Sequence, residues 1–170
     1  PLLRVFERLD KDHIPYKVAM VFSPTLSHML GDPLLIERYL EFLDSRIEFG
    51  AEEVRHNKKD KRLYQLSSMY YDRLVEDRVL FTERYEHNLL KAFDYYQKKG
   101  RLELLTTAAT YAFLPFFLSY PEAIQAQIEV AIASHRAAFG RNPQGFWLPE
   151  LGWYPGLDDY LRAYNFNYSI

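Results

Sequence analysis

The sequence predicts an α/β fold in which short strands alternate with helices. Four short segments rich in β-branched and aromatic residues are separated by stretches whose apolar residues recur with helical spacing. Strands joined through such helices pair in parallel, because a parallel pair needs a long crossover connection. The 170 residues are 48% apolar by type, which is enough to bury a globular core.

The first two elements are predicted to be a helix and a buried strand. Apolar residues mark one face of residues 2–10, which indicates a helix. The run KVAMVF at 17–22 follows Pro15 and is stopped by Ser23 and Pro24, as is typical of a short buried strand. Together they form the incoming half of an αβ unit.

A long helical segment follows the first strand. Asp32 and Pro33 favour the start of a helix, and apolar residues then recur with helical spacing. A polar link at 56–62 separates this series from a second one, which Gly100 ends. We therefore predict a helical insertion over residues 32–100.

The rest of the sequence returns to alternating strands and helices. An apolar segment at 112–117 is broken by Pro115, and Gly140 ends an Ala-rich helix. The chain begins without Met and stops within an apolar strand, so we expect residues 1–170 to be part of one longer catalytic domain. The predicted elements are strands at 102–107, 145–150 and 166–170, and helices at 121–139 and 157–163.

Composition excludes several classes of protein. Lys plus Arg number 21 against 23 Asp plus Glu, so no positive field recruits nucleic acid or an anionic membrane. The absence of cysteine excludes disulfides and thiol chemistry and makes the cytoplasm the default location. No apolar run could span a membrane, and no signal peptide is evident. The histidines lack the spacing of paired metal ligands, and no nucleotide-binding glycine motif occurs, so we expect neither a metal nor a cofactor.

Glu150 is the first candidate for catalysis. It ends the strand predicted within GFWLPELGWYPG at 145–156, and catalytic residues of parallel α/β folds gather at the carboxyl ends of strands. Trp147, Trp153 and Tyr154 flank it, and a carboxylate with aromatic platforms is what glycoside chemistry needs, so we take the three as candidate substrate-binding residues. The alternative is a surface glutamate in a turn beside two structural tryptophans.

Glu103 is the second candidate carboxylate. Alternation along the strand at 102–107 places it on the same face as Leu105, pointing into a barrel interior or a cleft. The alternative is a structural carboxylate that is paired with Arg or with backbone amides.

Two stretches resemble glycoside hydrolase family 57, in particular its 1,4-α-glucan branching enzymes. GRLELLTTAATYAFLPFF at 100–117 and GFWLPELGWYPGLDDYL at 145–161 look like the second and third conserved regions of that family. The opening PLLRVFERL, the loop VFSPTLSHML and the helical insertion follow the family's order of segments more loosely. The resemblance implies a partial (β/α)7 barrel with parallel strands and a long helical insertion.

The resemblance also implies roles for individual residues. Glu150 would be the catalytic nucleophile, and Glu103, Tyr111 and Trp147 would line the glucan site. Tyr111 departs from the family pattern, because many members carry His there, so a phenol would have to replace the imidazole in a hydrogen bond to substrate.

Further parts of the family's catalytic site are expected outside the chain. The His-containing first region would precede Pro1, and the Asp acid/base would follow Ile170, so residues 1–170 alone are expected to be inactive. Leu151 stands where branching enzymes often have Cys, a change that we expect to be tolerated.

The function implied is double displacement with retention on α-1,4-glucans, forming the α-1,6 branches of glycogen. The expected partners are an α-glucan chain and the remainder of the same catalytic domain. Within the family, an α-amylase or a 4-α-glucanotransferase is the alternative. Outside it, a metal-dependent polysaccharide deacetylase would need metal ligands that the sequence lacks, and a non-catalytic α-glucan-binding module would make Glu150 incidental.

Overall fold

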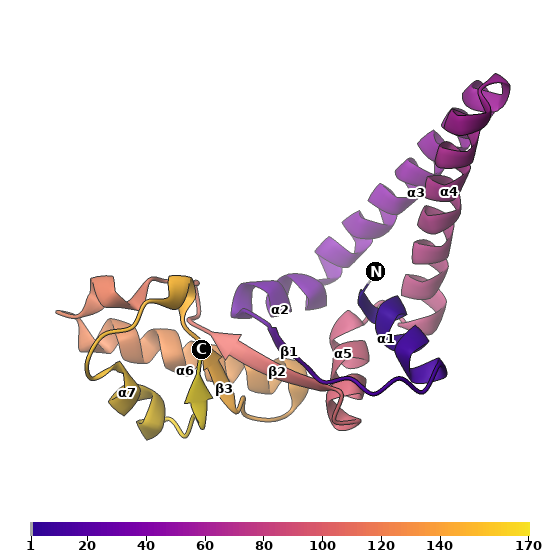
Figure 1. Cartoon of the computed structure of the whole chain (residues 1–170). Coiled ribbons are helices and arrows are strands. Elements are labelled where there is room, and N and C mark those ends of the chain that lie inside the picture. The colour runs from indigo at the N-terminus through magenta and orange to yellow at the C-terminus, as the bar shows by residue number, and fades with distance from the viewer. Residues whose placement is uncertain (1) are drawn as a thin grey trace. The chain divides into compact units, whose positions relative to one another are not determined.

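The computed structural model describes residues 2–170 (Figure 1). Contacts within the chain divide it into two compact units. Unit 1 consists of Pro1–Met29 and Leu90–Ile170, and unit 2 consists of Leu30–Leu89. Unit 1 contains the strands, and unit 2 is helical.

Unit 1 is built on a parallel four-stranded sheet. The strands lie in the order β1-β2-β3-β4, so each strand pairs with the next one along the chain. This arrangement confirms the predicted α/β class, because helical crossovers join the successive parallel strands. The strands are β1 (Val18–Val21), β2 (Leu102–Thr107), β3 (Gly145–Trp147) and β4 (Tyr168–Ser169).

Helices and short turns connect these strands. Gly140 ends one of the helices in the left-handed conformation, with φ of 69°, as its position after the Ala-rich run predicts. The elements are α1 (Leu2–Lys11), α2 (Pro24–Gly31), α5 (Leu89–Lys98), η3 (Leu114–Phe117), α6 (Pro121–Phe139), η4 (Pro149–Leu151) and α7 (Leu157–Ala163).

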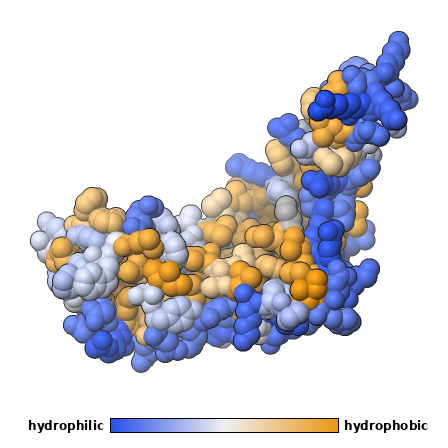
Figure 2. Space-filling view, in the orientation of Figure 1, coloured by the Kyte–Doolittle hydropathy of each residue, from blue (hydrophilic) through white to orange (hydrophobic). Residues whose placement is uncertain are grey.

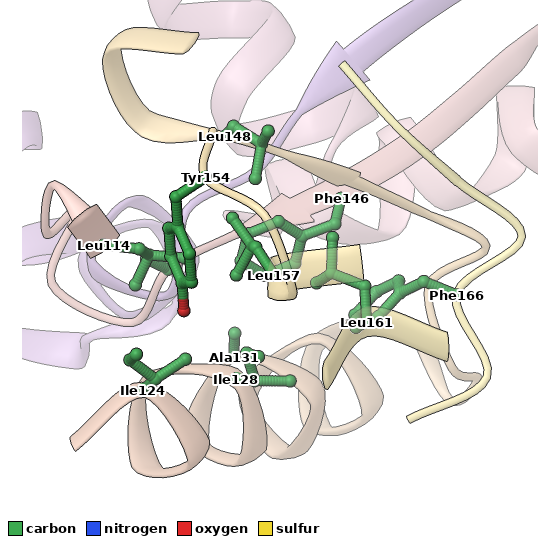
Figure 3. Close-up of a cluster of buried hydrophobic side chains, with 11 residues drawn as sticks. Leu114, Ile124, Ile128, Ala131, Phe146, Leu148, Tyr154, Leu157, Leu161 and Phe166 are labelled. Carbon is green, nitrogen blue, oxygen red and sulfur yellow. The ribbon is translucent and has the colours of Figure 1, made fainter. Parts of the chain in front are cut away.

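One face of the sheet packs against helices to form the core of unit 1. Phe146 of β3 is fully buried, and α6 presents Ile128 and Ala131 to it while α7 presents Leu157 and Leu161 (Figure 3). The spacing of the buried residues on α6 is helical, so one stripe of this helix covers the sheet.

The opposite face of the sheet is less covered, and we call it the Glu103 face. Parallel register and the alternation of side chains put Glu103, Leu105, Gly145, Trp147 and Tyr168 on it. A Cβ atom built on Gly145 would lie 2.8 Å from the Cδ2 atom of Leu105, which confirms that the two residues point to the same side. Glu103 itself is exposed.

Unit 2 is a helical hairpin. Its first helix begins after Asp32, whose side chain accepts a hydrogen bond from the Leu35 N–H at 3.0 Å. Asp60 caps the second helix in the same way, accepting from the N–H groups of Arg62 and Leu63. The elements are α3 (Pro33–His56), η1 (Asn57–Lys59), α4 (Lys61–Val79) and the π-helix η2 (Leu80–Arg84).

Unit 2 is shorter than the predicted insertion over 32–100. After η2, residues Glu86 and His87 have φ of 49° and 61°, and this turn interrupts the helix that the apolar spacing predicts. The next helix, α5, packs in unit 1, where Phe93 contacts Phe22 with ring centroids 4.9 Å apart. Among residues 2–170, no helix combines the length and the apolar character that crossing a membrane requires.

Candidate active site

Glu150 lies just beyond the carboxyl end of β3 in a strained turn. Its backbone has φ of 53° and ψ of 26°, and the next residue, Leu151, also has φ of 53°. L-amino acids adopt this left-handed conformation at a cost of roughly 1–2 kcal/mol each, and such strain clusters at functional sites. The turn is held by hydrogen bonds from Leu151 N–H to Leu148 O at 2.9 Å and from Gly152 N–H to Pro149 O at 3.0 Å. The side chain of Glu150 is exposed.

A hydrogen bond joins the chain after β2 to the end of β3. The indole Nε1–H of Trp147 donates to the phenolic oxygen of Tyr111 at 3.2 Å. Thr107, the last residue of β2, donates from Oγ1 to the carbonyl oxygen of Trp147 at 2.8 Å. Tyr111 also has a positive φ, of 57°. Because its oxygen accepts from the indole, the phenol keeps its own proton to donate to a ligand.

The segment after β2 also packs against the turn that carries Glu150. A Cβ atom built on Gly152 would lie 2.5 Å from the Cε2 atom of Phe113 and 3.1 Å from the Cδ atom of Pro115. Only a glycine allows an aromatic ring to approach the backbone this closely. Gly152 therefore allows the segment after β2 to pack tightly against the turn beside Glu150.

The other two aromatic candidates of this segment have different surroundings. Trp153 is exposed, whereas Tyr154 is buried with its ring beside Leu114 (Figure 3). The Tyr154 hydroxyl is buried without a hydrogen-bond partner among the described residues, and burial raises the pKa of this phenol. Tyr154 thus serves the core in this structure, while Trp153 presents its ring to the surface.

Glu103 is not brought to the end of the sheet at which Glu150 lies. It stands four residues before Thr107 on β2, which corresponds to about 13 Å along a strand. Burial raises the pKa of the Tyr168 phenol, and the Glu103 carboxylate raises it further. Glu103 also lines a cavity of about 340 Å³ with Lys17 and Arg101. These contacts agree with the alternative of a paired carboxylate, although the partner is a tyrosine.

Sequence reasoning missed Tyr168 and the close contact that it makes. A Cβ atom on Gly145 would lie 2.5 Å from the Cζ atom of Tyr168, so the tyrosine ring crosses β3 where there is no side chain. The contact depends on strand register, and no local pattern in the sequence marks it. Phe113 and Gly152 were missed for the same reason, although aromatic residues around Pro115 after a strand were a usable signal.

No group of three or more His, Cys, Asp or Glu side chains in residues 2–170 is arranged to hold a metal ion.

Comparison with known proteins identifies the family. The family model of glycosyl hydrolase family 57 matches residues 2–170. The chain belongs to glycosyl hydrolase family 57. The 1,4-alpha-glucan branching enzyme of Thermococcus kodakarensis is 27% identical over 155 residues, which are 91% of this chain and 22% of that protein.

Solved structures share the fold of the chain. The alpha-amylase AmyC from Thermotoga maritima has a TM-score of 0.93 and 34% identity. The match covers 99% of this chain and 32% of AmyC. The GH57-type branching enzyme from Pyrococcus horikoshii has a TM-score of 0.89 and 26% identity. The match covers 99% of this chain and 34% of the branching enzyme. The chain therefore spans about a third or less of the length of these relatives. Its four strands are part of the family's (β/α)7 barrel.

Proposed function

We propose that the protein containing this chain is a retaining transglycosylase that acts on α-1,4-glucans and forms α-1,6 branches, with Glu150 as its nucleophile. The observation that carries the proposal is the position of Glu150. It is an exposed carboxylate on a left-handed backbone at the carboxyl end of a parallel strand, in a family of glycosyl hydrolases. Branching enzymes among the relatives supply the reaction.

The first step forms a covalent glycosyl-enzyme. A carboxylate oxygen of Glu150 bonds to the anomeric carbon of the glucan as the bond to the leaving oxygen breaks. A carboxylic acid outside residues 1–170 gives its proton to that oxygen, so the leaving glucan departs as an alcohol. In the second step, a 6-hydroxyl of another glucan forms a bond to the anomeric carbon as the ester bond to Glu150 breaks. The proton of this hydroxyl returns to the carboxyl group that protonated the leaving oxygen in the first step.

The contacts around Glu150 support a sugar subsite at this strand end. Trp147 offers an indole face whose N–H is already bonded to Tyr111, so its remaining interaction with a sugar ring is stacking. Tyr111 keeps a proton that can donate to a sugar hydroxyl. Trp153 adds a second exposed ring. Tyr154 and Glu103 are left out of this subsite because of their packing and position.

An α-amylase is the second candidate function. The observation that favours it is the structural match to AmyC, which has both a higher identity and a higher TM-score than the branching-enzyme structure. Both reactions share the glycosyl-enzyme and differ in whether water or a sugar hydroxyl captures it. New α-1,6 linkages on amylose would favour branching, and release of reducing ends alone would favour the amylase.

The nucleophile is tested by Glu150→Gln in the whole protein. The amide keeps the shape of the side chain but cannot form the ester, so we expect turnover to fall by at least about 10³-fold while amylose binding is kept. Glu122→Gln, an exposed glutamate in the first turn of α6, is the matched control and should leave turnover unchanged. Substantial turnover by the Glu150 variant would refute the assignment.

A further inference from the structure

A cluster of exposed apolar side chains borders the turn of Glu150, and of these only Trp153 is used in the subsite described above. We call this cluster the rim. Its side chains are between 59% and 81% exposed, with Trp153 at the lower and Phe116 at the upper limit. Figure 2 shows hydrophobic atoms on the surface at this end of unit 1, at the left of the view. The rim consists of Phe116, Leu151 and Trp153.

The rim is held by the packing of the segment after β2 against the turn that carries Glu150. The ring of Phe116 contacts that of Phe113 edge to face, with centroids 4.8 Å apart. Phe113 in turn lies against the backbone of Gly152, which stands between the rim residues Leu151 and Trp153. The rim is therefore continuous with the turn that carries Glu150, and a molecule that binds the rim lies next to the candidate nucleophile.

The composition of the rim indicates the class of molecule that it fits. The sequence has no charged residue from Leu104 to Pro121 and none from Leu151 to Leu157. An uncharged surface with exposed aromatic rings offers nothing to a polyanion, whose binding depends on Lys and Arg. It suits the C–H faces of neutral sugar rings.

We propose that the rim binds the acceptor glucan chain and thereby directs the glycosyl group to a sugar hydroxyl instead of water. This inference rests on the proposed function and names the second substrate of the same site. A chain lying on the rim places its hydroxyls beside the glycosyl-enzyme and displaces water from that side. We assign Trp147 and Tyr111 to the donor glucan, so we expect the rim to affect the second step more than the first.

The test changes the rim in the whole protein and measures both outcomes of the second step. Phe116→Ala removes the most exposed ring, and we expect the ratio of new α-1,6 linkages to released reducing ends on amylose to fall about three- to tenfold. Total donor cleavage should stay within about twofold, since the rim acts mainly on the second step. Phe116→Trp keeps an aromatic face and should keep the ratio. Val130→Ala, at an exposed apolar residue of α6, is the control and should change neither quantity.

The outcomes separate this inference from the proposed function. If cleavage is normal and the ratio is unchanged in Phe116→Ala, the rim does not bind the acceptor. A lower melting temperature with an unchanged ratio also overturns the inference, because it shows that another part of the protein covers the rim.

A second measurement applies if the wild-type protein cleaves no glucan, in which case the proposed function fails. Affinity electrophoresis on amylose then compares Glu150→Gln with and without Phe116→Ala. Weaker retention of the double variant supports glucan binding by the rim, and equal retention refutes it.

Discussion

His135 is a titratable residue in the core of unit 1. It lies on the buried stripe of α6, is 2% exposed, and has its ring 4.8 Å from that of Phe139. Both ring nitrogens are buried without a hydrogen-bond partner in the part of the chain that the structure describes. Burial, with a smaller effect from Arg141, lowers the pKa of His135 from 6.5 to about 4.

This buried histidine makes the stability of the protein depend on pH. The unfolded chain takes up a proton near pH 6.5 and the folded chain only near pH 4, so the free energy of unfolding is unaffected above pH 6.5 and falls between those values. The full loss is about 3 kcal/mol. Urea unfolding of the whole protein at pH 7 and pH 4.5 should show it, and His135→Leu should reduce the difference. His28→Gln, at an exposed histidine, should not. An equal pH dependence in wild type and His135→Leu would contradict the prediction.

The sequence predicts the exposed position of Glu150 but not the buried position of Tyr154, for a physical reason. A carboxylate after a strand that Pro149 ends, in a loop with several glycines, has few options other than the surface. Tyr154 stands in the same loop, but its ring turns into the core beside Leu114. Side chains in a loop do not alternate with a fixed period, as they do in a strand or a helix. The direction of each one therefore depends on tertiary packing, which no local sequence pattern predicts.

At the scale of elements, β3 contains the closest contact on the Glu103 face. Gly145→Ala would place a methyl group 2.5 Å from the Cζ atom of Tyr168 and 2.8 Å from the Cδ2 atom of Leu105. The tyrosine ring must then move away from β3. We expect the free energy of unfolding of the whole protein to fall by about 1–3 kcal/mol.

A double-mutant cycle checks this expectation. Combining Gly145→Ala with Tyr168→Ala should cost less than the sum of the single changes, because the second change removes the ring with which the methyl group collides. Tyr168→Phe keeps the ring and removes only the hydroxyl, so it should not relieve the effect of Gly145→Ala. Additive costs in the cycle would show that the collision is absent.

The end of the helical hairpin shows where periodicity fails. Apolar residues continue in helical spacing from α4 into α5, which predicts one helix over 63–96. The structure interrupts it with a π-helix and with Glu86 and His87 at positive φ. Neither is glycine, so the turn has no compositional signal. Beyond this turn, α5 packs in unit 1, where Phe93 contacts Phe22.

At the scale of the molecule, the two units differ in how much they bury. In the fully described segment 30–89, only Leu43 and Phe81 are buried. By contrast, β2 and α6 of unit 1 each contain several buried residues. Exposed helices with few buried side chains open more readily. We therefore expect amides of α4 to exchange with deuterium at least about tenfold faster than those of β2 in the whole protein. Equal protection would mean that another part of the protein covers the hairpin.

Most of the architecture of unit 1 could be predicted from the sequence. Strands with apolar runs and helices with a single apolar face leave few arrangements other than a parallel α/β sheet. The division into units could not be predicted, because it depends on whether α5 packs against the strands or against the helical hairpin. The position of Glu150 beyond a strand end could be predicted. The hydrogen bond between Trp147 and Tyr111 could not, since it joins segments that meet through the pairing of β2 and β3.

The tyrosine that crosses β3 has a consequence for how the sheet is assembled. Displacing β4 by one residue would turn the Tyr168 ring to the side of Phe146, and displacing it by two would set the ring against Trp147 or Pro143. Among those positions only the glycine leaves space for it. Backbone hydrogen bonds join β4 to β3 but would form in other alignments too, so the missing side chain at Gly145 favours one alignment over the others.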